Sequence, residues 1–340
     1  HENCVFMMTH LKKHTGLLFI ALSILGAGCI EKERPIAPRP PSQLESYQVS
    51  LGDGYGTRSH FNLSTGEVVA SHPKEAWDLA FAVNSESGSP ILQTRLNTSR
   101  FMRVTALENA SLSDPFPETV DESLWGFDSP LGPSDGLTMA QLDFSNGEIC
   151  LLDMGYSSAA EIMGFMMVNI QSEGNQVTLE YKNEQGPIMS STFTLDENRE
   201  WTYFSLLSGQ TVNLEPEPGT WHLMFSGYTE IFDYEGGPLP YLVTGVLSIP
   251  EGTQVYDAGT DQNWDDLFNS DWDGMAFTDH WNTIGYDWKS YSLELGEYSV
   301  DDAHLYCARD ATGREFLFRF LDFYDSSGNP GTITLEIRER

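Results

Sequence analysis

An acidic segment in the last third of the chain carries oxygen donors at the spacing that calcium loops use. In residues 269–274 (NSDWDG), Asn269, Asp271 and Asp273 fall on every second residue, and a glycine follows. Such oxygens can surround Ca²⁺, and glycine permits the sharp turn of the loop. The position that normally supplies a bidentate glutamate is His280. The missing glutamate favours a solvated acidic loop, and Asn269, Asp271 and Asp273 remain the candidate ligands for a calcium site.

Motifs that organise catalysis are missing from the sequence. It contains no G-x-S-x-G, H-E-x-x-H or G-x-G-x-x-G motif and no Walker loop. The glycine-rich residues 52–56 precede a predicted strand rather than a helix, which is typical of a turn. We therefore expect a protein that is not an enzyme.

The charge of the chain excludes one class of partner. Its 340 residues include 18 Lys and Arg against 50 Asp and Glu, for a formal net charge of −32. Nucleic-acid binding requires clustered basic residues, so this composition argues against it. The excess of carboxylates fits a highly soluble exported surface or a cation-binding one.

The N-terminal residues read as an export and anchoring signal. Lys12 and Lys13 precede a short apolar run that ends in Leu-Gly-Ala-Gly before Cys29, which resembles a bacterial lipobox. We expect residues 1–28 to be a signal peptide with upstream read-through, and Cys29 to be acylated. An ordinary signal peptide is the alternative. Residues 29–44 are rich in proline and form a predicted tether. Because Ile30 follows the cysteine, we expect delivery to the outer membrane or cell surface, with the lipid as the only membrane contact.

The sequence after the tether predicts a domain region composed almost entirely of β-strands. Residues 77–81, 316–324 and 332–337 follow strand patterns, separated by glycine-rich turns. Residues 106–111 and 263–268 could each form a helical turn or two. The pattern predicts an all-β fold of antiparallel sheets or sandwiches.

An internal duplication divides this part in two. Residues 61–81 (FNLSTGEVVASHPKEAWDLAF) are repeated as residues 204–225, and residues 174–181 are echoed by 328–337. We therefore predict two tandem domains, residues 45–185 (the first repeat) and 186–340 (the second repeat), that superpose strand for strand. One barrel with a single core is the alternative. Cys150 and Cys307 fall near corresponding places, either as buried free thiols or as a disulfide.

The order of motifs in the second repeat resembles the HmuY-like haem-binding lipoproteins. It contains YFSLLSG from Tyr203, the strand motif around Trp221, and a closing stretch with Gly313, Arg319 and Asp322 before a last strand. The closing stretch of the first repeat departs from this pattern and looks degenerate. The resemblance implies an all-β fold and a lipid-anchored haem carrier that hands haem, taken up free or from a haem-carrying protein, to an outer-membrane transporter.

A haem-binding member of that family needs axial His or Met side chains between the Trp strand and the closing stretch. The second repeat offers Met275, His280 and His304 there, and imidazole nitrogen and thioether sulfur are suitable donors to iron. Nearby aromatic residues could line a porphyrin slot: Phe277, Trp281, Tyr286 and Trp288. Between Phe81 and its closing stretch, the first repeat offers Met102 and Met139 and no histidine. We therefore expect any haem site in the second repeat, near Met275 and His280.

Two functions follow from these observations. The first is haem capture at the cell surface, with Met275, His280 and His304 as candidate ligands. The second is a non-catalytic binding or scaffold lipoprotein that kept the fold without haem and uses its acidic, aromatic surface for calcium, glycan or protein contacts.

Overall fold

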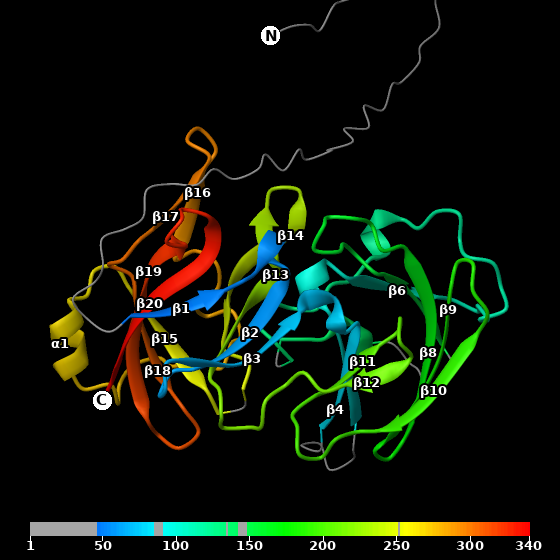
Figure 1. Cartoon of the computed structure of the whole chain (residues 1–340). Coiled ribbons are helices and arrows are strands. Elements are labelled where there is room, and N and C mark those ends of the chain that lie inside the picture. The colour runs from blue at the N-terminus through cyan, green and yellow to red at the C-terminus, as the bar shows by residue number, and fades with distance from the viewer. Residues whose placement is uncertain (1–45, 85–90, 134, 142–147, 251) are drawn as a thin grey trace, which may run out of the picture. The chain divides into compact units, whose positions relative to one another are not determined.

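The computed structural model confirms that the chain is an all-β protein of antiparallel sheets (Figure 1). The structure describes residues 46–84, 91–133, 135–141, 148–250 and 252–340. The predicted signal peptide, Cys29 and the tether lie outside the described residues. Within the described part of the chain, we find no helix that is both long and apolar enough to span a membrane.

Four sheets and one small hairpin make up the fold. Sheet A has the strand order β1 (Ser46–Ser50), β20 (Pro330–Glu339), β19 (Glu315–Tyr324), β18 (Leu305–Arg309), β15 (Gln254–Gly259). Sheet B has the order β14 (Gly237–Leu247), β13 (Leu223–Tyr234), β2 (Thr57–Asn62), β3 (Glu67–Pro73). Sheet C has the order β12 (Gln210–Val212), β11 (Thr202–Ser205), β4 (Leu79–Asn84), β5 (Ile91–Leu96). Sheet D has the order β10 (Met189–Thr194), β9 (Gln176–Asn183), β8 (Phe165–Glu173), β7 (Ile149–Asp153), β6 (Arg103–Leu107).

The remaining elements are short. β16 (Lys289–Ser292) and β17 (Glu297–Val300) form the hairpin. The one α-helix among the described residues is α1 (Trp264–Asn269). The described 3-10 helices are Asp53–Tyr55, Lys74–Ala76, Thr98–Arg100, Glu122–Leu124 and Thr138–Gln141. A helical turn is therefore found where residues 263–268 were expected to form one. It is not found at residues 106–111, where β6 ends in a turn closed by the Ala110 N–H donating to the Leu107 carbonyl.

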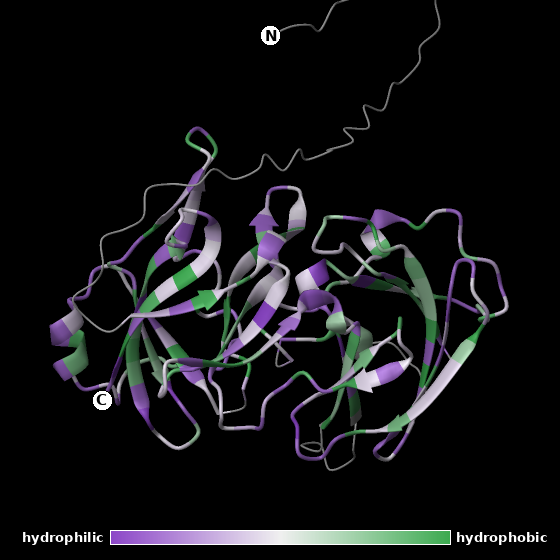
Figure 2. Cartoon of the chain, in the orientation of Figure 1, coloured by the Kyte–Doolittle hydropathy of each residue, from purple (hydrophilic) through white to green (hydrophobic). Residues whose placement is uncertain are grey.

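The sheets form two sandwiches, each with its own core. Alternation of buried and exposed residues, clearest along β20, gives each sheet an apolar face (Figure 2). The A/B core joins residues of sheets A and B, among them Phe61, Phe225 and Phe320. The C/D core joins residues of sheets C and D, among them Phe81 and Phe204. A single barrel with one core is not what the chain forms.

The sandwiches combine strands from both halves of the sequence. β2 of the first repeat pairs with β13 of the second, and β11 of the second pairs with β4 of the first. β1 likewise pairs with the last strand, β20. The spatial grouping is therefore residues 74–213 in one sandwich and residues 46–73 with 214–340 in the other. This grouping of strands in space differs from the predicted division of the sequence at 185/186. That division remains a prediction about where one sequence repeat ends and the next begins.

The strand order of sheet D corresponds element by element to that of sheet A. β10, β9, β8, β7 and β6 occupy the places in sheet D that β1, β20, β19, β18 and β15 occupy in sheet A. The turns after β2 and β11 also match, because Gly66 and Gly209 both adopt left-handed φ values of 69° and 70°. In each turn the glycine N–H donates to a carbonyl four residues earlier, at 2.9 Å in both cases. The two repeats thus exchange their N-terminal strands.

Candidate functional site

The segment between β15 and β18, residues 260–304, carries the predicted site residues and covers part of the outer face of sheet A. Its helix α1 begins at the Asn263 side chain, which accepts hydrogen bonds from the N–H groups of Asp265 and Asp266. Leu267 and Trp272 are buried against Leu317 of β19 in an apolar cluster on that face. The segment is therefore held to sheet A by this apolar packing and by one backbone bridge between Thr278 and Val255 of β15.

The predicted calcium donors do not converge. The Asn269 amide donates to the Asp265 carbonyl at 2.7 Å, so this side chain serves the helix end. The Asp271 carboxylate accepts from the Asp273 N–H at 3.1 Å, and the Asp273 carboxylate lies 3.6 Å from the Arg309 guanidinium. Among the described residues, no group of three or more His, Cys, Asp or Glu is placed to hold a metal ion. The geometry fits the alternative of a solvated acidic loop.

The three predicted haem ligands occupy different environments. Met275 is partly buried in the apolar cluster with Trp272. His280 is exposed, and only backbone atoms of this residue appear among its described hydrogen bonds. The His304 ring stacks on Tyr306 with ring centroids 4.5 Å apart, and its Nε2 lies 2.6 Å from Asp257 Oδ1.

The His304 ring is engaged by a carboxylate. Burial by itself lowers the pKa of His304, but the hydrogen bond to Asp257 and the carboxylates of Asp257, Asp287 and Asp301 outweigh it and raise the pKa above its ordinary value. Because Nε2 of His304 is bound to Asp257 and the described hydrogen bonds of His280 involve only its backbone, His280 is the more available of the two histidines.

The four aromatic residues expected to line one slot are spread over several clusters, and only Trp281 and Tyr286 pack against the same one. Phe277 packs under the Arg309 guanidinium, which lies 4.4 Å from its ring centroid. Trp281 lies 6.4 Å from Trp201, and Trp288 is buried in the A/B core against Phe320. Trp77 and Trp221 are also buried, but in clusters outside the A/B and C/D cores, because each precedes its strand. Regular alternation does not apply to residues outside the strand.

Cys150 and Cys307 are both buried free thiols, so the disulfide alternative is wrong. Cys150 belongs to the C/D core, whereas Cys307 lies in the cluster on the outer face of sheet A. Burial raises the pKa of each thiol to about 12. Neither is a reactive nucleophile at neutral pH.

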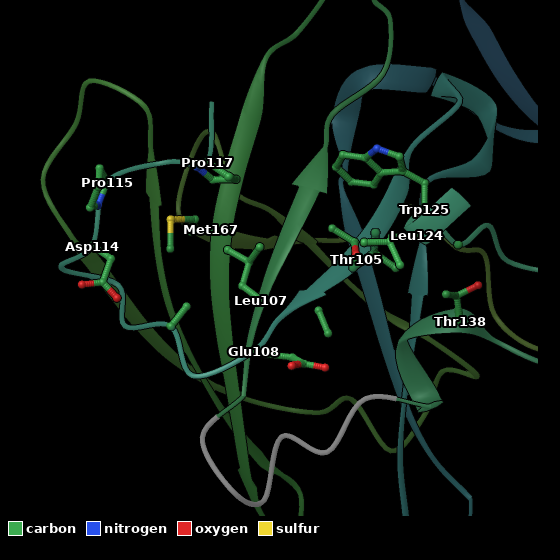
Figure 3. A pocket seen from close by; sticks show the side chains of 14 residues that line it. Thr105, Leu107, Glu108, Asp114, Pro115, Pro117, Leu124, Trp125, Thr138 and Met167 are labelled. Carbon is green, nitrogen blue, oxygen red and sulfur yellow. The ribbon is translucent and has the colours of Figure 1, made fainter. Parts of the chain in front are cut away.

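Two open pockets adjoin the loop around Trp125, where no site was predicted. One pocket of about 740 Å³ lies beside β6 on the outer side of sheet D. Figure 3 shows Trp125, Leu124 and Leu107 around it, with Met167 of β8 and the proline-containing loop opposite. We call it the β6 pocket. One sequence signal could have indicated this pocket: a long loop without regular secondary structure that contains Pro115, Pro117 and Trp125.

A second pocket of about 1060 Å³ shares Trp125 and Thr138 with the β6 pocket. Its other walls include Phe101, Phe127 and the hairpin of β13 and β14. Phe101 has a left-handed φ of 64° and packs against Phe127 with ring centroids 5.0 Å apart. A left-handed phenylalanine is strained, so this wall is held in place by its packing.

Asp128 ties the loop between the two pockets to sheet C. Its carboxylate accepts from the Leu96 N–H at 2.7 Å and from the Thr138 N–H at 2.9 Å. Burial raises the pKa of Asp128 from 3.8 to about 6, although these hydrogen bonds and Arg95 act in the opposite direction. The folded state therefore binds this proton more tightly than the unfolded state does.

We expect Asp128 to make stability fall as the pH rises. The contribution of Asp128 to the free energy of unfolding is fully present below the pKa that this carboxyl has in the unfolded chain. It is lost as the pH rises through the folded-state pKa of about 6. Relative to Asp128→Asn, the unfolding free energy of the natural protein should decrease by on the order of 2 kcal/mol from pH 4 to pH 7. Urea unfolding across this range measures it, with the exposed Asp233→Asn as the control. A difference that does not change with pH would contradict the assignment.

Comparison with known proteins gives one family. Residues 197–337 match the family described as HmuY protein. No curated protein matches the chain. Among solved structures, apo PinO from Porphyromonas gingivitis is similar at 11% identity, covering 88% of this chain and 98% of that chain, with a TM-score of 0.26. A lipoprotein candidate from Bacteroides fragilis is similar at 15% identity, covering 49% and 91%, with a TM-score of 0.22. At such TM-scores neither likeness supports a conclusion.

Proposed function

We propose that the chain is an exported, non-catalytic binding protein that captures haem at the cell surface and hands it to an outer-membrane transporter. The observation that carries this proposal is the match of residues 197–337 to the HmuY family. The family is associated with haem binding, and the matched residues include Met275, His280 and His304.

His280 is the ligand that the surroundings favour. It is exposed within the matched residues, whereas His304 is engaged with Asp257. Met275 lies on the same segment and would have to leave its apolar cluster to reach the same iron. Haem propionates would meet Asp271 and Asp273, and the guanidinium of Arg309 beside Asp273 supplies an opposite charge.

We expect haemin titrated into the protein to give a shifted Soret band that His280→Ala and Met275→Ala weaken or abolish. His304→Ala is the matched control, because this histidine is already paired with a carboxylate, and it should leave the band unchanged. Absorbance spectroscopy measures both. No shift in the natural protein, or a shift that survives His280→Ala together with Met275→Ala, would remove the proposal.

A second candidate function is a non-catalytic binding or scaffold protein without haem. The observation that favours it is the pair of open pockets that share Trp125 and Thr138, neither of which is lined by His280 or Met275. Haem titration separates the two functions, because the second predicts no Soret shift while its pockets remain available.

A further inference from the structure

The strand β6 lies at an edge of sheet D, with β7 as its only neighbour in the sheet. Its outer edge is bridged by one residue pair, in which Val104 and Gly126 exchange hydrogen bonds of 3.0 and 2.8 Å. The backbone groups of Val104 therefore point away from β7. Successive residues of a strand direct these groups to opposite edges, so those of Ala106 also point outward.

The outward groups of Ala106 face a site where another strand could pair. Within the described residues, no backbone hydrogen bond outside the sheet ladder involves Ala106. Residues 104–108 together line the β6 pocket, so the open edge and the cavity are one surface (Figure 3). An unpaired strand edge offers hydrogen bonds to an extended peptide, and a pocket beside it can accept a side chain.

The pocket has the lining that a peptide side chain requires. Leu107, Trp125 and Met167 give it apolar walls, and Leu124, which is 62% exposed, lies at its rim. The ionisable side chains that line it are both acidic, Glu108 and Asp114. Asp114 accepts a hydrogen bond from the Ser111 N–H, whereas Glu108 is exposed directly after the strand. Charge complementarity therefore favours a basic peptide.

The corresponding strand of the second repeat has its outer face covered. Val255 of β15 pairs with Thr278 through two hydrogen bonds of 2.9 Å, as Val104 pairs with Gly126. Beyond this pair, the Asp257 carboxylate binds the Gly259 N–H and His304. Trp272, which is 1% exposed, and Phe277 fill the space on the outer face. The space on the outer face is thus filled by the chain itself beside β15, whereas the described residues leave a pocket beside β6.

We propose that the free edge of β6 and the β6 pocket bind an extended, basic segment of a partner polypeptide by strand addition. The segment pairs with the backbone of Ala106, inserts an apolar side chain toward Trp125 and Met167, and places a lysine or arginine beside Glu108. This inference rests on the second candidate function, a binding or scaffold protein, and is independent of haem capture.

The test uses the full folded protein and a short fluorescein-labelled peptide of alternating lysine and valine. We expect saturable binding by fluorescence anisotropy. A version of the peptide N-methylated at alternate amides should bind about tenfold more weakly, because it loses backbone hydrogen bonds to β6. A version with glutamate in place of lysine should not bind measurably.

Two variants locate the site. Ala106→Pro removes the outward N–H but leaves the bonds between β6 and β7, and should weaken binding about tenfold. Glu108→Lys should weaken it several-fold through charge repulsion. The matched control Glu173→Lys, an exposed carboxylate at the far end of β8, should bind like the natural protein.

Other outcomes would overturn the proposal. Equal binding of the N-methylated peptide would exclude strand addition, and equal binding by Glu108→Lys and Glu173→Lys would place the peptide elsewhere. If the Ala106→Pro variant no longer unfolds cooperatively on heating, the N-methylated peptide and the Glu108→Lys variant still test whether the peptide binds at β6. If haemin displaces the peptide competitively, the β6 pocket would be assigned to an apolar macrocycle rather than to a peptide side chain. Failure of this test with an intact Soret shift would leave haem capture standing.

Discussion

Phe61→Ala is expected to destabilise the protein by about 3–5 kcal/mol, the usual loss for a buried phenylalanine. Phe61 is fully buried, and its ring lies edge-on to that of Phe225, with centroids 5.7 Å apart. Because the two residues belong to different repeats, this contact exists only if the N-terminal strands are exchanged. Chemical denaturation of the single variant measures the loss.

A double-mutant cycle separates the exchanged arrangement from its alternative. Phe61→Ala and Phe225→Ala should couple by about 0.5–1.5 kcal/mol or more, as contacting aromatic residues do. Phe61→Ala and Phe81→Ala should be additive, because Phe81 belongs to the C/D core. The reverse result, coupling with Phe81 and not with Phe225, would show that each repeat keeps its own N-terminal strands.

Asp78→Ala should destabilise the protein by about 3–5 kcal/mol, since it leaves the Arg100 guanidinium buried without its carboxylate. Both side chains are almost fully buried, at 3% and 2% exposure. The other carboxylate oxygen of Asp78 accepts from the Leu206 N–H at 2.7 Å, and Arg100 also donates to the Met154 carbonyl. The loss should appear as a lower urea midpoint.

The matched control is a salt bridge at the surface. Glu122→Ala breaks the contact of an exposed carboxylate, 77% exposed, with Arg103 and should cost less than about 1 kcal/mol. Replacing Asp78 and Arg100 together by apolar residues should recover part of the loss, because no unpaired charge remains. Equal losses for Asp78→Ala and Glu122→Ala would contradict the buried role of Asp78.

Asp78 also shows how the two repeats preserve one interaction with different chemistry. The position that corresponds to it in the second repeat is His222, which accepts from the Leu63 N–H at 3.0 Å through Nδ1. Leu63 and Leu206 correspond in the repeat, so each side chain fastens the hairpin that comes from the other half. Burial lowers the pKa of His222, which keeps Nδ1 free to accept this hydrogen bond.

The amino-acid sequence by itself determined the fold class and the repeated elements. Strand periodicity, the glycines at 66 and 209, and the apolar residues at Phe61, Phe81, Phe204 and Phe225 are local features, and the structure places all four phenylalanines in cores. The family resemblance of the second repeat was equally readable, since it depends on residue order along the chain.

Only the tertiary structure decided which strands pair and where the chain is open. The two hairpins are so similar that either could complete either sheet, and the choice depends on how the connections at 74–78 and 213–222 run in space. The β6 pocket was hidden for a related reason: residues 104, 125 and 167 are far apart in the sequence and meet only across the sheet. Conversely, Met275, His280 and His304 are near in sequence but are separated by packing, exposure and the Asp257 pair.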